Sequence, residues 1–183
     1  MDAALTAPPL FAQLLGPAFA ALPAPVRALH LAQGPRRYRG RVEVARGSGL
    51  LSRLLAAATR LPPAGEGLLR VDIDARPQGE RWTRHVGGRA MPSRLWRDGD
   101  LLCERLGPVR FGFRLRAAEG AIHWQVVQAR VLGLPLPAAW FAGVGARESA
   151  DGARYCFDVW AAMPLAGPLV HYRGWLAVDD CVD

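Results

Sequence analysis

The amino-acid sequence predicts a mainly β protein, either a strongly curved antiparallel sheet or a closed barrel of about nine or ten strands. The clearest pattern lies at residues 109–116, where apolar residues alternate with arginine and glycine. Successive side chains of a strand point to opposite faces, so this segment has one apolar and one cationic face. Turn-forming residues also recur about every ten positions from Gly67 onward, which is the spacing of sandwiches and barrels. Because many short strands seldom stay flat, we expect the sheet to curl, split or close.

Residues 1–34 are predicted to form short helices separated by prolines. Pro8-Pro9 can open one helix that ends near Leu15, and Pro25 suits the first turn of a second. We interpret this segment as a helical flap packed on the sheet, since apolar helices this short depend on tertiary contacts. The alternative is an amphipathic helix that binds a membrane or a partner.

The first strand is expected at residues 37–46, where the arginines of the RRYRGR run share one face. We interpret this face as solvated, because charge discourages edge-to-edge association of strands. A nucleic-acid surface would add stacking aromatic residues, so we expect no nucleic-acid partner. One helix is predicted to follow at residues 50–60, with Ser48 as its N-cap and Pro62-Pro63 as its end.

The rest of the chain is predicted to be an antiparallel meander. Strands are expected at residues 71–75, 80–86, 89–96, 101–106, 109–116, 122–132, 145–149, 154–162 and 169–178, with a loop at Gly133–Pro137. A helix-grip fold is the competing architecture, but it requires a long C-terminal helix where the sequence predicts a strand. The 183 residues suit one domain: a helical flap (1–34), the β-meander (35–178) and an acidic tail (179–183).

Composition limits the class of protein. Hydrophobic residues make up 51% and charged residues 21% of the chain, which is typical of a globular protein. The formal net charge is +7, and every basic residue is arginine. Three cysteines at wide spacings argue against a disulfide framework and for a reducing compartment. Prolines interrupt the apolar N-terminal region, so we expect no signal peptide, no integral membrane segment and a cytoplasmic location.

No catalytic or metal-binding motif is present in the sequence. The histidines are far apart, and none forms the close pairs typical of metal sites. Asp72 and Asp74 share a strand face opposite apolar residues, so a solvated outer face is expected rather than an acid–base site. We therefore expect no catalytic residue, no metal and no cofactor.

The predicted strands at residues 80–86 and 169–178 have mixed polarity, unlike the cleanly amphipathic strands around them. Charged groups that face inward need partners, because a lone buried charge is very costly. One interpretation is a polar anchor in a cavity, where an arginine holds a carboxylate or phosphate head group. The other is a surface ladder of ion pairs with tryptophans covering the core. The candidate ligand-binding residues are Glu80, Trp82, Arg84, Glu104, His171, Arg173 and Trp175.

The segments ERWTRHVGG, CERLGPVRFGF, RVLGLPLP and PLAGPLVHYRGWL resemble a bacterial domain-of-unknown-function family, DUF family 4166. The resemblance covers roughly Pro23 to Val178. Members occur alone or fused behind a saccharopine-dehydrogenase-like oxidoreductase, which implies that the domain handles a substrate or partner of such an enzyme. The resemblance implies no catalytic residues, and the present chain has no nucleotide-binding half.

Two functions are consistent with these observations. The first is non-enzymatic binding of a small amphipathic or apolar ligand inside the barrel. The second is an interaction module with a filled core, serving as a homodimer or as the accessory partner of an oxidoreductase. The volume of the interior separates them, because ligand pockets usually measure about 300–1,000 Å³.

Overall fold

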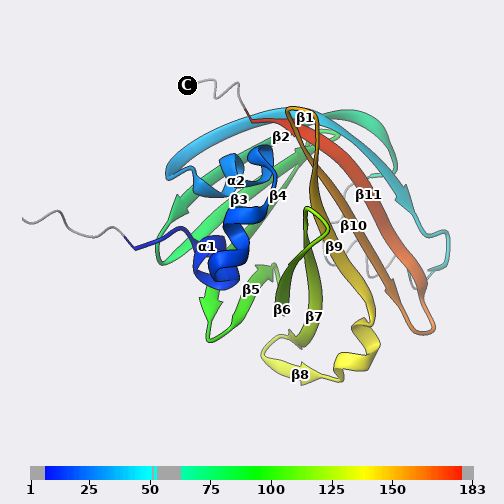
Figure 1. Cartoon of the computed structure of the whole chain (residues 1–183). Helices are drawn as coiled ribbons and strands as arrows, with labels where there is room; N and C mark the ends of the chain where they lie inside the picture. The colour runs from blue at the N-terminus through cyan, green and yellow to red at the C-terminus, as the bar shows by residue number, and fades with distance from the viewer. Residues whose placement is uncertain (1–6, 51, 53–62, 179–183) are drawn as a thin grey trace, which may run out of the picture.

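The computed structural model describes residues 7–50, 52 and 63–178 (Figure 1). It is mainly β, as predicted: ten antiparallel strands close into a barrel and one further strand pairs outside the closed ring. The strands are β1 (Gly34–Arg46), β2 (Gly65–Arg76), β3 (Gly79–Val86), β4 (Arg89–Asp98), β5 (Leu101–Leu106), β6 (Val109–Ala118), β7 (Ala121–Val131), β8 (Leu134–Leu136), β9 (Gly143–Asp151), β10 (Arg154–Met163) and β11 (Gly167–Ala177).

Hairpins account for most of the neighbouring strand pairs. The sheet order is β6-β5-β4-β3-β2-β1-β11-β10-β9-β7-β8, and β6 also pairs with β7, so that ten of the strands form a closed ring. Two pairings join strands that do not follow each other in the chain, β1 with β11 and β7 with β9. The loop predicted at Gly133–Pro137 is wrong in part, because β8 pairs there with the end of β7. This short strand continues the ladder beyond the turn without entering the barrel.

The short N-terminal helices expected from the proline spacing are present. They are α1 (Leu10–Leu15), α2 (Ala24–Leu31) and the intervening 3₁₀ helix η1 (Gly16–Ala21); a second 3₁₀ helix, η2 (Ala138–Phe141), follows β8. Within the described ranges, no helix is both long and apolar enough to cross a membrane. The helix predicted at 50–60 lies outside the described residues except for Leu50 and Ser52, and so does the tail at 179–183.

Two glycines allow β1 and β11 to approach closely where the barrel closes. A Cβ atom at Gly40 would overlap the carbonyl oxygen of Trp175, and one at Gly174 would overlap that of Arg41. Glycine in a strand often marks such a close backbone approach. The absence of side chains at these two positions therefore permits the pairing that joins the first and last strands.

The barrel has two different ends. Because neighbouring strands are antiparallel, the turns that follow β2, β4, β6 and β9 lie at one end, which we call the plug end. There the Gln13 side-chain amide donates to the carbonyl oxygen of Pro77 at 3.3 Å, and Pro23 lies beside Gly120. The connections after β3, β5, β7 and β10 lie at the opposite end, which we call the mouth. Figure 1 shows α1 and α2 together on one side of the barrel, away from β8.

Candidate functional site: a cavity in the barrel

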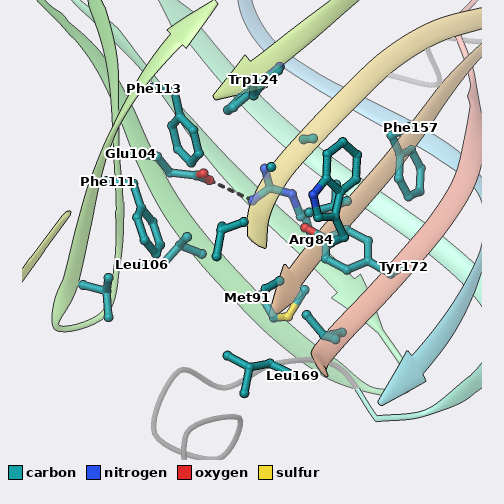
Figure 2. Close-up of a pocket in the computed structure, with 18 of the residues that line it drawn as sticks. Arg84, Met91, Glu104, Leu106, Phe111, Phe113, Trp124, Phe157, Leu169 and Tyr172 are labelled. Carbon is teal, nitrogen blue, oxygen red and sulfur yellow. Dashed lines mark hydrogen bonds and ion pairs between the residues drawn. The ribbon is translucent and has the colours of Figure 1, made fainter. Parts of the chain in front are cut away.

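The barrel encloses a cavity of about 610 Å³ (Figure 2). Its wall is formed by residues of all eleven strands and of η2, and most of them are aliphatic or aromatic. The volume lies within the range of small-molecule sites. The polar side chains of the wall are few: Arg84, Glu104, Glu148, Tyr155 and Tyr172.

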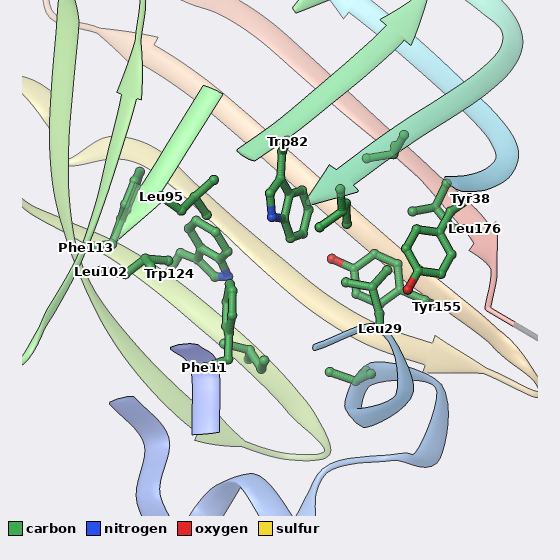
Figure 3. Packing of buried hydrophobic residues seen from close by; sticks show 14 of the residues in the cluster. Phe11, Leu29, Tyr38, Trp82, Leu95, Leu102, Phe113, Trp124, Tyr155 and Leu176 are labelled. Atoms are coloured by element: carbon green, nitrogen blue, oxygen red, sulfur yellow. The ribbon is translucent and has the colours of Figure 1, made fainter. Parts of the chain in front are cut away.

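An aromatic layer separates the cavity from the plug end (Figure 3). Phe11 of α1 is 0% exposed and stacks on His30 of α2 with ring centroids 3.7 Å apart. Phe11 also contacts Trp124 of β7 at 5.7 Å, and His30 lies 6.1 Å from the ring of Trp82. Proline directly before each helix fixes the chain entry that brings these apolar faces onto the barrel. The helices therefore fill this end with buried side chains.

The cavity reaches solvent at the mouth. Leu132, Leu134 and Trp140 line it and are 80%, 70% and 47% exposed, respectively. A side chain that lines the cavity can be largely exposed only if the cavity opens to solvent beside it. Leu106, just before the β5–β6 connection, and Leu169, just after the β10–β11 connection, appear at the edge of the same space in Figure 2.

An ion pair joins β3 and β5 over the inner face of β4, the strand between them. Arg84 Nη1 donates to Glu104 Oε1 at 3.3 Å and to Ser93 Oγ at 3.0 Å, while its guanidinium lies 5.1 Å from the Trp82 ring. Burial by itself lowers the pKa of Arg84, but the Glu104 carboxylate and the Tyr172 and Tyr155 hydroxyls outweigh it and raise the pKa above its ordinary value. Glu104 is thus the carboxylate that pairs with Arg84, and both of the hydrogen bonds given above use Nη1.

A second polar group lies between the cavity and the plug. His30 Nε2 and Glu148 Oε2 are 2.6 Å apart and both side chains are buried. Burial, followed by the neighbouring Glu148 carboxylate, raises the pKa of Tyr155 well above its ordinary value. Trp82 Nε1 donates to Glu80 Oε2 at 2.7 Å, and burial raises the pKa of Glu80. These contacts connect α2 with the strands β3, β9 and β10.

Comparison with known families decides which family this barrel represents. A family model described as a domain of unknown function, DUF4166, matches residues 22–176, which is most of the chain. The chain belongs to the DUF4166 family. The resemblance seen in the sequence is therefore confirmed, whereas the fusion to an oxidoreductase stays a prediction. No curated protein matches the chain.

The structure brings four of the seven candidate residues of this DUF4166 chain together. Trp82, Arg84 and Glu104 line the cavity, and Glu80 lies behind them, hydrogen-bonded to Trp82. Glu104 is the ion-pair partner of Arg84. The shared parity of residues 80, 82 and 84 therefore places these side chains on the inner face.

The structure does not bring His171, Arg173 and Trp175 to the cavity. They lie on the outer face of β11, whose inner face carries Tyr172 and Leu176. His171 contacts Asp158 at 2.6 Å and Arg173 contacts Glu43 at 2.9 Å. Trp175 lies under the guanidinium of Arg154 at 4.2 Å. The contacts of β11 therefore match the interpretation of a surface ladder of ion pairs. The carboxylates that pair with these side chains belong to the neighbouring strands β1 and β10.

Sequence reasoning missed several residues of the site. Glu148 shares its parity with Val144, Ala146 and Ala150, so an isolated carboxylate on an apolar face was the available signal. His30 similarly lies on the helical face that carries Val26 and Leu29. Tyr155 and Tyr172 resemble ordinary core residues in sequence, and only the coordinates place their hydroxyls near Arg84. The described residues contain no group of three His, Cys, Asp or Glu side chains suited to a metal ion.

Proposed function

We propose that this barrel binds a small amphipathic or apolar ligand in its cavity, without catalysis. The observation that carries the proposal is a largely apolar space of about 610 Å³ that is filled at the plug end and reaches solvent at the mouth. Pockets that bury small molecules have this size and combine an apolar wall with a few placed polar groups.

The wall suggests how such a ligand would lie. Its apolar body would contact Phe111, Phe113 and Leu106, and its polar end would reach the Arg84–Glu104 pair. Because Glu104 already balances the charge of Arg84, a neutral oxygen such as a hydroxyl or carbonyl suits this position better than a full anion. The N–H groups of Arg84 other than those of Nη1 would donate to that oxygen.

The cavity counts against the alternative of an interaction module with a filled core. A closed, fully packed barrel would leave no space of this size, since protein interiors contain few voids larger than a water molecule. A role beside an oxidoreductase comes from the resemblance alone and stays a prediction.

Native mass spectrometry of freshly purified protein tests the proposal directly. We expect a co-purifying species of small mass, and we expect a fluorescent fatty alcohol added to delipidated protein to bind and to be displaced by unlabelled fatty alcohol. The double variant Leu106→Trp and Met91→Trp should weaken this binding strongly, because both side chains line the cavity and the larger indole rings would take up part of its space.

Leu68→Trp is the matched control, because Leu68 is exposed on the outer face of β2 and does not line the cavity. This variant should bind the fatty alcohol like the parent protein. Equal binding by the parent, the control and the cavity-filling variant would place the fatty alcohol outside the barrel and contradict the proposed function.

A further inference from the structure

Apolar side chains surround the mouth without being covered by the described chain. We call Leu132, Leu134, Trp140 and Leu165 the apolar rim. Leu165, in the turn between β10 and β11, is 101% exposed, so its side chain has no neighbour that shields it from water. Leu132 lies in the turn between β7 and β8, Leu134 is the first residue of β8, and Trp140 belongs to η2. Several connections therefore present large apolar groups at the same end of the barrel.

Two of these leucines adopt a backbone conformation that leucine disfavours. Leu132 has φ of 53° and Leu165 has φ of 68°, in the left-handed region that glycine occupies most readily. For a bulky residue this conformation costs roughly 1–2 kcal/mol. Glycine would suit these exposed turn positions better for stability alone. Strained positions of this kind are commonly retained at functional sites.

A row of arginines leads to the same end of the barrel. They are direct cross-strand neighbours on five adjacent strands, in the order Arg81, Arg94, Arg105, Arg110 and Arg130. Among the described residues, only Arg110 of this row has an ion pair, with Asp98 at 2.7 Å. Like charges directly opposite each other destabilise a sheet. Arg105, Arg110 and Arg130 lie near the mouth, and Arg130 is next to the hairpin that carries Leu132 and Leu134.

The charge of the two ends differs. The turns of the plug end and the strand residues next to them carry four carboxylates, Asp98, Asp100, Glu119 and Asp151, and two arginines, Arg76 and Arg154. The described parts of the mouth connections carry no carboxylate; Glu66, the second residue of β2, is the first one along the adjacent strands. Among the described residues, the mouth thus combines exposed apolar groups with two arginines, Arg105 and Arg130, that have no carboxylate partner.

We propose that the mouth docks on an anionic lipid bilayer, with the apolar rim inserted among the lipids and the arginine row on the head groups. Basic residues beside apolar side chains are typical of proteins that lie at a membrane surface, where cations attract anionic lipids and apolar groups enter the interface. A second copy of the chain fits less well, because a symmetric contact would bring two basic surfaces together. Nucleic acid would meet the arginines but would leave the leucines exposed.

The proposal rests on the proposed function for its purpose, since an apolar ligand would enter or leave the cavity directly from lipid. Docking itself is measured without any cavity ligand. The cavity-filling variant with Leu106→Trp and Met91→Trp should therefore still bind vesicles, so the two proposals can fail separately.

Vesicle flotation tests the docking surface. We expect binding to vesicles of phosphatidylcholine mixed with phosphatidylglycerol and much weaker binding to phosphatidylcholine alone. Replacing Arg105 and Arg130 by Gln should weaken binding about 30-fold, since each basic residue near an anionic surface contributes roughly a factor of five. Arg39→Gln with Arg41→Gln removes the same charge from the outer face of β1 and should change binding less than about threefold.

The apolar rim is tested by Leu132→Ser together with Leu134→Ser, which should weaken binding about tenfold or more while the arginines remain. Equal loss in both pairs of arginine variants, or no loss in the serine variant, would overturn the proposal. Binding to a DNA duplex as tight as to vesicles and unaffected by the serine substitutions would overturn it as well. So would a dimer in analytical ultracentrifugation that the serine substitutions dissociate.

Discussion

At the plug end, apolar side chains of α1 and α2 are buried against aromatic residues of the strands, whereas at the mouth leucines of similar size are exposed. Phe11 and Leu132 represent the two situations, with 0% and 80% exposure. The difference shows that apolar residues outside the strands have different structural roles at the two ends of the barrel. At one end it closes the interior, and at the other it surrounds the entrance to the cavity.

The largest expected effect comes from a pair of substitutions that compares the two ends. Phe11→Ala should lower the free energy of unfolding by about 3–5 kcal/mol, because it removes a fully buried ring that contacts His30 and Trp124. Leu132→Ala should change it by less than about 0.5 kcal/mol, since the side chain is exposed. Urea unfolding at equilibrium measures both. Similar losses in the two variants would show that the mouth is packed as tightly as the plug.

A second prediction concerns the pH dependence of the buried carboxyl group near the plug. Burial raises the pKa of Glu80 above its ordinary value of 4.5, so the folded state retains this proton to a higher pH than the unfolded state does. Stability should therefore fall as the pH rises from 4.5 through the folded pKa. Glu80→Gln mimics the protonated form, and its amide oxygen can still accept from Trp82 Nε1.

The Glu80→Gln variant and the parent protein should have the same free energy of unfolding near pH 4. At neutral pH the free energy of unfolding of the variant should be higher by on the order of 1 kcal/mol. Urea unfolding across this pH range measures the difference between the two proteins, in which the other titrating groups cancel. A difference that stays constant with pH would mean that Glu80 ionises in the folded protein as it does in the unfolded chain.

The smallest expected effect concerns the backbone of the mouth. Leu132→Gly should raise the free energy of unfolding by up to about 1 kcal/mol, because glycine relieves the left-handed strain. The gain is limited because glycine also increases the conformational entropy of the unfolded chain. Leu68→Gly, at an equally exposed strand position without positive φ, should instead lower it by about 0.5–1 kcal/mol. A loss of stability in both variants would show that Leu132 is not strained.

Local patterns in the sequence predicted most of the elements but not how the barrel closes. The alternation at residues 109–116 predicted β6, and the prolines located α1 and α2. The pairing of β1 with β11 joins segments about as far apart as the chain allows, and no local signal specifies it. The mostly β fold was therefore predictable, while the choice between a closed barrel and an open sheet was not.

The site was predictable where one strand carried its polar residues on a single inner face. Glu80, Trp82 and Arg84 share that parity, so their convergence could be anticipated. The same kind of mixed pattern on β11 faces outward, because periodicity gives two faces but does not say which one is inside. The cavity volume depends on how far each side chain reaches across the barrel, which only coordinates provide.

The closure of the ring between β1 and β11 also has a consequence for biosynthesis. During translation β1 emerges well before its partner β11, because the nine strands β2 to β10 lie between them in the chain. One edge of the nascent meander therefore stays unpaired until β11 has been synthesised, and contacts of such long sequence separation form slowly. Arginines at alternate positions along β1 place positive charge beside this unpaired edge, which discourages its pairing with other nascent chains.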